Sequence, residues 1–364
     1  MIGVAVVGTG FGQKVHIPGF QAHHNTEITA VYHRDINKAK AIATTHNIPH
    51  AADNLSDILT LSTVQAVSIS TPPFLHYEMA KTVLQAGKHL LLEKPTTLNA
   101  SEAKELYQLA KNNNVIATVD FEFRFVPEWQ FFAQLLASNY VGNLRFIKID
   151  WLGASRADIS RPWNWYSTKE KGGGVLGSLG SHAFDYIHWL FGSISRLNAN
   201  LSTAISTRID PINGEIKPVN TDDTCMLSLE LANGTPCQVS ISAVVHAPRP
   251  HSIEVYGDQG TLVLSSDNQK DYIHGFQVWG SKLGQPLTAM EIPKQLLFPQ
   301  HYADGRICAF IRVVDQWVKG IETQEEIIPS LREGVYSQLL MDLSHQSDES
   351  GCWLDVPSLD SFLA

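Results

Sequence analysis

Residues 4–16 read VAVVGTGFGQKVH, so a short apolar run passes directly into three closely spaced glycines, Gly8, Gly10 and Gly12. This order is typical of a buried strand that turns into a helix whose N-terminus holds a phosphate. Gly8 permits the tight turn, and Gly10 lets the backbone approach a pyrophosphate. The third glycine comes one place early, because Gln13 stands where the dinucleotide-binding fingerprint has Gly or Ala. The stretch favours a nucleotide-binding βαβ unit over a strand–turn–helix without a ligand.

The rest of the first third continues this alternation of strands and helices. Amphipathic helices are expected at 76–86 and 100–112, and Asn99 caps the second of them, with Glu102 completing a capping box. Four short apolar runs suit the strands of a parallel sheet that helices cover on both faces: residues 4–7, 28–32, 64–70 and 89–92. This pattern predicts a doubly wound parallel sheet, the Rossmann type of α/β domain.

Beyond about residue 120 the pattern changes to longer segments of alternating polar and apolar residues. Asn233–Gly234 marks a hairpin turn there. Six strands are expected, at 144–151, 197–206, 224–231, 238–245, 252–256 and 261–264. Four helices are expected against them, at 128–138, 181–190, 303–319 and 331–345. The sequence thus predicts a Rossmann domain over 1–122 and a second α/β domain, with a large, mostly antiparallel open sheet, over 123–364.

Composition excludes several classes of protein. A chain of 364 residues, 44% hydrophobic and 17% charged, is expected to be globular with two cores. Its formal net charge of -9 disfavours nucleic acid and a membrane surface as partners. We see no secretory signal and no apolar segment of membrane-spanning length, so a cytoplasmic protein is expected. No metal site is predicted, because the cysteines lack CxxC spacing and four histidines have the pattern of ordinary surface residues: His23, His24, His46 and His50.

The residues at the end of the second predicted strand indicate whether the cofactor is NAD or NADP. It reads AVYHRD over residues 30–35, with His33 and Arg34 at the place where an NAD site usually has an acidic residue. A guanidinium can pair bidentately with the 2′-phosphate of NADP, and Lys38 adds positive charge nearby. We therefore predict NADP rather than NAD. Two alternatives stay open: Arg34 is an ordinary solvated residue, or Asp35 binds the ribose of NAD.

Two other strand ends carry polar groups. SISTPPFLH (68–76) places Thr-Pro-Pro, and LLLEKP (90–95) places Glu93 and Lys94, at the carboxyl ends of buried strands. Ligands of open α/β sheets gather at this edge. A lysine there is partly withdrawn from water, which suits it to proton transfer. The alternative for Glu93 and Lys94 is a local ion pair that closes the strand.

Five motifs occur in a fixed order along nearly the whole chain: GTGFGQKVH (8–16), STPPFLH (70–76), EKP (93–95), RFVP (124–127) and GGGVLGSLGSHAFD (172–185). In this combination they resemble the Gfo/Idh/MocA family, that of glucose–fructose oxidoreductase and inositol dehydrogenase. The resemblance implies a Rossmann domain, then an α/β domain on an open sheet, and a small-molecule substrate. Because helices cover one face of such a sheet, a homodimer or homotetramer through the other face is expected.

The resemblance also implies roles for single residues. Lys94 would be catalytic, holding the substrate hydroxyl and relaying its proton, and His182 would be the second acid–base group. Glu93 would approach the nicotinamide ribose. The further residues expected at the cofactor are Gly8, Gly10, Phe11, Gly12, His33, Arg34, Lys38, Thr71, Pro72, His76 and, besides its catalytic role, Lys94. Alternatively, His182 merely packs under the glycine turn.

The remaining candidates concern the substrate. Many members of the family have Asp four residues before the histidine, where this chain has Ser178. Asp185, one helical turn after His182, is expected to orient the imidazole or touch a sugar hydroxyl. Arg124 is either a substrate clamp or half of a structural ion pair. The segment SRPWNWYSTKEKGGG (160–174) holds Trp163 and Trp165, which suit stacking on a sugar or nicotinamide, or equally an interface or core plug.

These residues together predict an NAD(P)-dependent oxidoreductase that transfers hydride to or from a carbinol carbon of a sugar, polyol or sugar derivative. Ser178 keeps a second hypothesis open, a catalytically silent protein of the same fold that senses a nucleotide or sugar. A third is a dehydrogenase or reductase of a non-sugar substrate.

Overall fold

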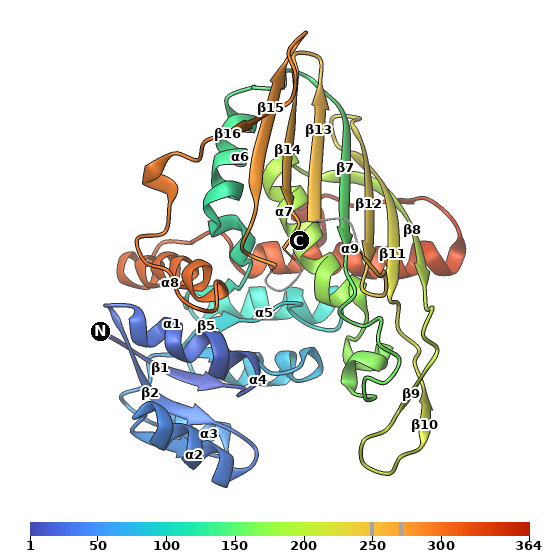
Figure 1. Ribbon diagram of the computed structural model, residues 1–364. Helices are drawn as coiled ribbons and strands as arrows, with labels where there is room; N and C mark the ends of the chain where they lie inside the picture. Colours follow the sequence, from blue (N-terminus) through green and yellow to red (C-terminus); the bar gives the residue numbers. More distant parts are fainter. Residues whose placement is uncertain (248–250, 269–271) are drawn as a thin grey trace. The chain divides into compact units, whose positions relative to one another are not determined.

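Six strands near the N-terminus form a parallel sheet in the order β3-β2-β1-β4-β5-β6 (Figure 1). The computed structural model describes residues 1–247, 251–268 and 272–364. The central strands are buried along their whole length and mostly apolar, and helices connect them, so this is the predicted Rossmann sheet. Its strands are β1 (Ile2–Val7), β2 (Thr26–Tyr32), β3 (His50–Ala52), β4 (Ala66–Ile69), β5 (His89–Leu92) and β6 (Ala117–Val119).

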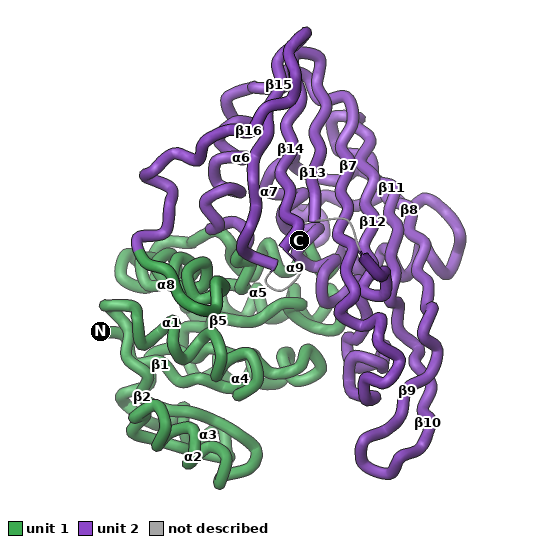
Figure 2. Tube along the Cα trace, viewed as in Figure 1, with its two compact units in different colours: residues 1–122, 300–338 green, residues 123–299, 339–364 purple. Residues whose placement is uncertain are grey.

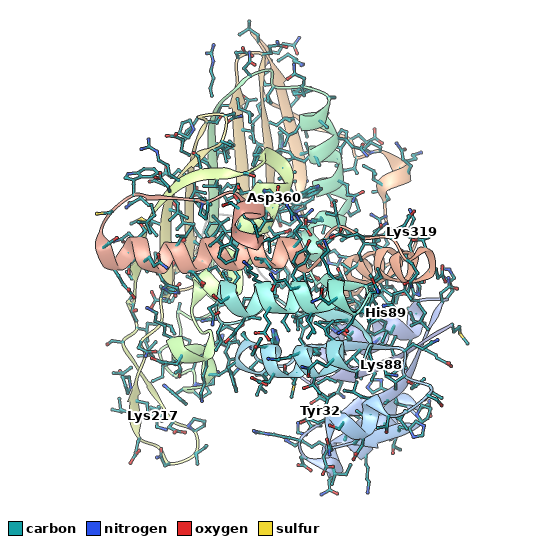
Figure 3. The ribbon with its side chains drawn as sticks, turned by 180° about the vertical axis from the view of Figure 1, so that it is seen from behind. Tyr32, Lys88, His89, Lys217, Lys319 and Asp360 are labelled. Atoms are coloured by element: carbon teal, nitrogen blue, oxygen red, sulfur yellow. The ribbon has the colours of Figure 1, made fainter. Side chains whose placement is uncertain are left out.

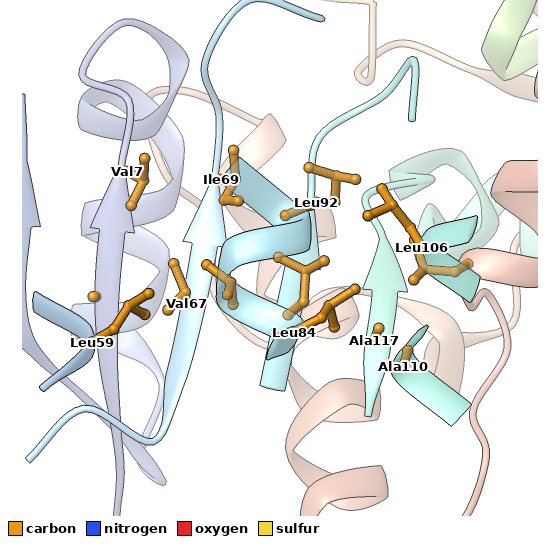
Figure 4. Close-up of a cluster of buried hydrophobic side chains, with 14 of the residues drawn as sticks. Val7, Leu59, Val67, Ile69, Leu84, Leu92, Leu106, Ala110 and Ala117 are labelled. Atoms are coloured by element: carbon orange, nitrogen blue, oxygen red, sulfur yellow. The ribbon is translucent and has the colours of Figure 1, made fainter. Parts of the chain in front are cut away.

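The core of this sheet joins neighbouring strands to two helices. Figure 4 shows Val7, Ile69 and Leu92 of β1, β4 and β5 beside Leu84 of α4 and Leu106 of α5, all five fully buried. The helices among these strands are α1 (Ile17–Ala22), α2 (Ile36–His46), α3 (Leu55–Leu59), α4 (His76–Gln85) and α5 (Ala100–Asn112), with a π-helical turn η1 (Gly12–His16) and a 3₁₀ turn η2 (Pro73–Leu75).

The chain divides into two compact units, coloured separately in Figure 2. The first holds residues 1–122 and 300–338, and the second holds residues 123–299 and 339–364. Residues 300–338, expected in the second domain, therefore belong to the first unit. The reason is packing, because Phe310 of α8 (Arg306–Thr323) stacks on the ring of His16 and also meets Phe20.

One surface histidine was predicted wrongly. His23 is buried, and its Nε2 lies 3.0 Å from Oδ1 of Asp315 in α8. The sequence around His23 is polar, so nothing in it indicates that a helix almost three hundred residues later covers this side chain.

The second unit is built on a nine-stranded sheet in the order β16-β15-β14-β13-β7-β12-β11-β8-β17. Among the strand pairs that the described residues form in this sheet, only β7–β12 is parallel, so the prediction of a mostly antiparallel sheet is confirmed. The strands are β7 (Leu144–Leu152), β8 (Ile194–Ser202), β11 (Thr224–Leu231), β12 (Pro236–Ser242), β13 (His251–Gly257), β14 (Gly260–Ser266), β15 (Gln277–Lys282), β16 (Thr288–Met290) and β17 (Leu354–Asp355).

Helices lie against one face of this sheet (Figure 1), and α6 packs on β14 and β15. They are α6 (Pro127–Ala137), α7 (Ser181–Phe191), the part of α9 (Leu331–Ser350) from residue 339 on, and α10 (Leu359–Leu363). A separate hairpin pairs β9 (Thr207–Ile209) with β10 (Ile216–Pro218), and a π-helical turn, η6 (Leu176–Gly180), precedes α7. Short 3₁₀ turns are η3 (Glu122–Phe125), η4 (Trp165–Ser167), η5 (Lys169–Lys171) and η7 (Lys294–Leu296).

Some elements have the bounds that the sequence predicted, whereas others are shifted or had no prediction. Strands β5 and β11 and helix α5 have the predicted bounds, and the Asn99 side chain accepts the Glu102 N–H at 3.0 Å. The Glu102 carboxylate accepts from Leu98 N rather than from the cap residue. Strand β8 begins three residues before its predicted start. The elements without a prediction include α2, α3 and six strands of two or three residues, which are too short to show a period.

None of the helices within the described ranges combines the length and the hydropathy that crossing a membrane requires.

Candidate active site

The glycine loop, which follows β1, lies so close to the residue after β4 that a side chain would not fit between them. Gly8 has φ +101°, and a Cβ on it would lie 2.6 Å from the carbonyl carbon of Ser70. A Cβ on Gly12 would lie 2.4 Å from Oγ of Ser70, so this early third glycine does the packing expected of the fingerprint's last one. A Cβ on Gly10 would meet nothing within 4 Å. The loop thus offers open space beside its backbone at Gly10, which fits the pyrophosphate of a dinucleotide.

Three buried titratable side chains meet behind this loop. His16, at the end of η1, has Nδ1 2.7 Å from Oγ of Ser68 and Nε2 3.1 Å from Oε1 of Glu93. Oδ2 of Asp120 lies 3.6 Å from the same Nε2. The imidazole also stacks on Phe310, with ring centroids 4.3 Å apart. Because Ser68, Glu93 and Asp120 belong to or follow β4, β5 and β6, one imidazole connects the carboxyl ends of three strands.

The cluster holds fewer positive than negative groups. Burial by itself would lower the pKa of His16, but hydrogen bonds and charges from Asp120 and Glu93 raise it above the ordinary value. Burial would raise the pKa of Glu93, yet His16, and the charge of Lys94, hold it below the usual range. Burial and the charge of Glu93 raise the pKa of Asp120 to about 6. Below about pH 6, Glu93 is therefore the anion of the cluster and His16 its cation, and above that pH Asp120 becomes a second anion.

The same three side chains have a spacing that could hold a metal ion, since their ligand atoms lie within 4.8 Å of one another. An ion would have to displace the hydrogen bond between His16 Nε2 and Glu93. His16 Nε2 and Glu93 Oε1 already share that hydrogen bond, and Oδ2 of Asp120 lies within ion-pair distance of the same Nε2, so the three side chains form a buried polar network.

Glu93 and Lys94 do not form the simple ion pair considered from the sequence. One oxygen of the Glu93 carboxylate accepts from His16, and the other accepts from the backbone N–H of Lys94 at 3.2 Å. Glu93 is buried, whereas Lys94 is only half-buried. The network therefore anchors the residue before Lys94 and leaves the ammonium group at the edge of the sheet where ligands gather.

His76 connects two of the predicted cofactor loops. Its Nδ1 lies 2.9 Å from the carbonyl oxygen of Pro95 and its Nε2 lies 2.7 Å from that of Thr71. A neutral imidazole can donate only one of these bonds, and burial lowers the pKa of His76 although both carbonyls favour the charged form. The side chain is fully buried, so His76 is a positioning residue for the loops that carry Thr71 and Lys94.

The tip of β2 keeps its basic side chains exposed. The strand ends at Tyr32, and His33 Nδ1 accepts the N–H of Asp35 at 2.9 Å. The Asp35 carboxylate caps α2, where it accepts from Asn37 N at 3.0 Å. Arg34 and Lys38 are exposed, and Phe11 of the glycine loop lies under the guanidinium of Arg306 at 5.0 Å. The helix cap thus engages Oδ1 of Asp35, the carboxylate that the sequence offered as an alternative for the ribose of NAD.

In the second unit, His182 lies among aromatic rings. It is the second residue of α7 and is buried, with ring centroids 5.0 Å from Phe123, 6.1 Å from Trp151 and 6.5 Å from Tyr272. The Phe123 ring stands edge-on to it. The η6 turn leads directly into this helix, so the glycine-rich segment sets the position of the imidazole.

Two substrate candidates pair with each other. Arg124 donates from Nη2 and Nε to Asp185, with distances of 2.7 Å and 2.9 Å, and both side chains are buried. Of the two alternatives for Arg124, this is the structural ion pair, and Asp185 is engaged with Arg124. Removing either partner would leave a buried charge, which typically costs 3–5 kcal/mol.

Ser178 has an arginine beside it. Its Oγ donates to the carbonyl of Gly174 at 2.8 Å and accepts from Nη2 of Arg156 at 3.4 Å. A carboxylate is also near: Asp222 accepts from Leu176 N at 2.7 Å, and burial raises the pKa of Asp222 to about 6. The sequence did not single out Arg156 or Asp222, because neither belongs to a motif.

Both tryptophans of the aromatic segment, residues 160–174, make contacts within the protein. Trp163 donates from Nε1 to the carbonyl of Pro218 at 3.0 Å, and Lys217 (labelled in Figure 3) lies 4.8 Å from its ring. Trp165 stacks on Tyr166 with centroids 3.9 Å apart. Trp163 thus packs against the β9–β10 hairpin and is only half-buried, so it is not a core side chain.

A cavity of about 260 Å³ lies within the second unit. Of the five predicted substrate residues, only Ser178 lines it, together with Arg156, Tyr166 and Asp222. Like Arg156 and Asp222, His16 and Asp120 were missed as functional candidates. Asp120 follows an apolar strand, as Glu93 does, and this is the signal that could have found it.

Comparisons with known proteins agree with this architecture. The Gfo/Idh/MocA model "Oxidoreductase family, NAD-binding Rossmann fold" matches residues 2–121, and the model of the family's C-terminal alpha/beta domain matches residues 133–356. An uncharacterized oxidoreductase of Synechocystis sp. is 53% identical over 362 residues, covering 99% of this chain and 98% of that protein.

More distant relatives have names that refer to sugars. Levoglucosan dehydrogenase of Pseudarthrobacter phenanthrenivorans is 26% identical, covering 82% of this chain and 81% of that one. Glucose-6-phosphate 3-dehydrogenase of Bacillus subtilis is 24% identical, covering 98% and 99%. The solved structure of levoglucosan dehydrogenase with NADH and L-sorbose has a TM-score of 0.91 and 23% identity, covering 99% of this chain and all of that one, and therefore has the same fold.

The charge balance of the buried cluster predicts a pH effect on stability. The pKa of Asp120, about 6 in the folded chain, lies above its ordinary 3.8, so between these values the folded chain binds more protons than the unfolded one. Rising pH therefore destabilises the fold in this window. Asp120→Asn removes this effect. The free energy of unfolding of the variant minus that of the unaltered chain is therefore expected to rise as pH goes from about 4 to about 6.

Urea unfolding over this pH range measures the difference. Asp57→Asn, which removes an exposed carboxylate, is the matched control and should give a flat difference. A flat or falling difference for Asp120→Asn would show that the cluster does not have the proposed charge balance.

Proposed function

Because the chain belongs to the Gfo/Idh/MocA oxidoreductase family, whose N-terminal domain is an NAD-binding Rossmann fold, we propose that it is an NADP-dependent oxidoreductase acting on a CH–OH group of a sugar, polyol or sugar derivative. The observation that carries the proposal is the anchoring of Glu93 by His16, which holds Lys94 at the carboxyl edge of the sheet next to the glycine loop. Levoglucosan dehydrogenase and glucose-6-phosphate 3-dehydrogenase, both relatives, support a carbohydrate substrate.

Each proposed role follows from the chemistry of alcohol oxidation. A bound nicotinamide supplies the hydride acceptor or donor. Lys94 holds the substrate hydroxyl and takes its proton as the carbinol carbon loses hydride, and the reverse reaction returns that proton. We propose His182 as the second acid–base group. The anionic Glu93 keeps the strand end in place and lies on the side of the nicotinamide ribose.

Replacing Lys94 tests the chemical role. Lys94→Ala is expected to lower turnover at least a hundredfold, because general acid–base catalysis typically contributes 10²–10⁴-fold, while NADP affinity stays within a few-fold. Nicotinamide absorbance over a panel of sugars and polyols gives turnover, and Lys111→Ala, at an exposed helix position, is the control. Unchanged turnover in Lys94→Ala would refute the assignment. Tight NADP binding by the unaltered protein without reduction across the panel would favour the sensing alternative.

Replacing Arg34 tests the cofactor preference. The exposed guanidinium and the engaged Asp35 carboxylate favour NADP. Arg34→Ala is expected to weaken NADP binding ten- to a hundredfold, as loss of a charged hydrogen-bond pair does, and to leave NAD binding almost unchanged. Titration of intrinsic fluorescence with each cofactor gives both dissociation constants, and Lys40→Ala serves as the control. Tighter binding of NAD than of NADP by the unaltered chain would reverse the choice.

We also propose that the chain associates with copies of itself through the sheet face that the helices leave open. Along β11, Cys225, Leu227 and Leu229 are buried, whereas Met226 between them is 52% exposed on the opposite face. Light scattering is expected to give a dimer or tetramer. Met226→Lys should shift it toward the monomer, and Ile212→Lys, at a residue 91% exposed, should not. A monomeric unaltered chain would contradict the proposal.

A further inference from the structure

We propose that the cavity of the second unit binds an anionic group of the substrate, a phosphate or a carboxylate, through the guanidinium of Arg156. This inference rests on the proposed oxidoreductase function, since it names the substrate class as anionic sugar derivatives. The cavity measures about 260 Å³, and all its lining residues belong to one unit. Ser178 at its wall lies four residues before His182 in one continuous helical segment.

The charged residues of the cavity make it locally basic. Three arginines, Arg156, Arg161 and Arg208, line it together with two aspartates, Asp222 and Asp223. Burial raises the pKa of Asp222 to about 6, so this carboxyl is largely neutral only below that pH, but the three arginines outnumber the two aspartates even when both are ionised. The whole chain carries a formal charge of -9, so a net positive cavity departs from its surroundings in the direction that attracts an anion.

Two of the arginines are bound to the backbone. Arg208 donates to the carbonyl oxygens of Arg156 at 2.7 Å and Asp158 at 2.9 Å, which fixes the loop over the cavity. Arg161 donates to the carbonyl oxygen of Ser155. These hydrogen bonds give Arg161 and Arg208 a structural role.

Arg156 is engaged differently. Its guanidinium lies 3.7 Å from the centroid of the Tyr166 ring and donates to Ser178 Oγ through a long bond of 3.4 Å. A guanidinium has five N–H donors, so these contacts leave donors for a ligand in the cavity. A planar group that rests on an aromatic ring is preorganised for bidentate binding of a carboxylate or phosphate. Burial lowers the pKa of Arg156, and a bound anion would offset that cost.

This arrangement gives a physical reason for a serine, rather than an aspartate, at position 178. An aspartate at the same place would lie within reach of Nη2 of Arg156 and would neutralise it. Serine keeps the hydrogen bond but adds no charge, so the guanidinium stays available to an anion. The departure from the family pattern at Ser178 is thus a change in what the cavity binds.

The test compares ligands that differ in charge. Calorimetric titration without cofactor uses glucose, gluconate, glucose 6-phosphate and inorganic phosphate as probes. The unaltered protein is expected to bind gluconate or glucose 6-phosphate at least tenfold more tightly than glucose, and the order of these two tells carboxylate from phosphate. Arg156→Met, which keeps the length of the side chain, should lose ten- to a hundredfold in affinity for the anion and little for glucose.

Two further variants keep the result interpretable. Arg145→Met, at an exposed arginine of β7, is the matched control and should leave all affinities unchanged. Ser178→Asp neutralises Arg156 without removing it and should weaken anion binding by a similar factor, which tests the proposal even if Arg156→Met does not fold. Anion affinities no higher than that of glucose, or equal losses in Arg156→Met and Arg145→Met, would overturn the inference.

The outcomes also separate this inference from the proposed function. Anion binding that depends on Arg156, without oxidation of any probe by NADP, would refute the oxidoreductase and keep the anion site. Oxidation of neutral sugars that is the same in Arg156→Met would refute the anion site and keep the oxidoreductase.

Discussion

The hydrogen bond between His16 and Glu93 is the interaction on which the first unit depends most directly. It joins the helix that follows the glycine loop to the residue before Lys94, two segments almost eighty residues apart. Because it is buried, water cannot replace it, and both partners depend on each other for their charge. Asp120 adds a second carboxylate, so the cluster gains fixed geometry at a cost in electrostatic energy.

This constraint explains how a short strand can present a lysine reliably. Helix α8 closes the cluster on one side, where Phe310 covers the imidazole. His76 connects the loops after β4 and β5 through two backbone carbonyls. The catalytic role proposed for Lys94 therefore rests on a framework of buried polar contacts as much as on the ammonium group itself.

In the second unit, Arg124 and Arg156 differ in whether a carboxylate directly balances their charge. The buried Arg124–Asp185 pair is balanced and needs no ligand, whereas Arg156 lies between a ring and a serine, with no carboxylate bonded directly to its guanidinium in the described part of the chain. Balanced pairs hold the fold together, and an incompletely balanced charge at a cavity is a feature that recognition of a ligand uses. Arg124 and Arg156 carry the same guanidinium group, and their different roles follow only from their neighbouring residues.

The sequence by itself predicted the fold class from apolar runs, glycines and their spacing, and the family from its resemblance in five ordered motifs. It also named the glycine loop and the EKP segment as candidate site residues, because these signals lie in local order. It left Arg124 and Asp185 as separate candidates, although they bind each other across 61 residues, and it passed over His16, Asp120 and Arg156. Those assignments needed the tertiary structure, since a side chain's partner, burial and charge depend on segments that the chain brings together only on folding. The same reason placed Phe310, and with it residues 300–338, in the first unit.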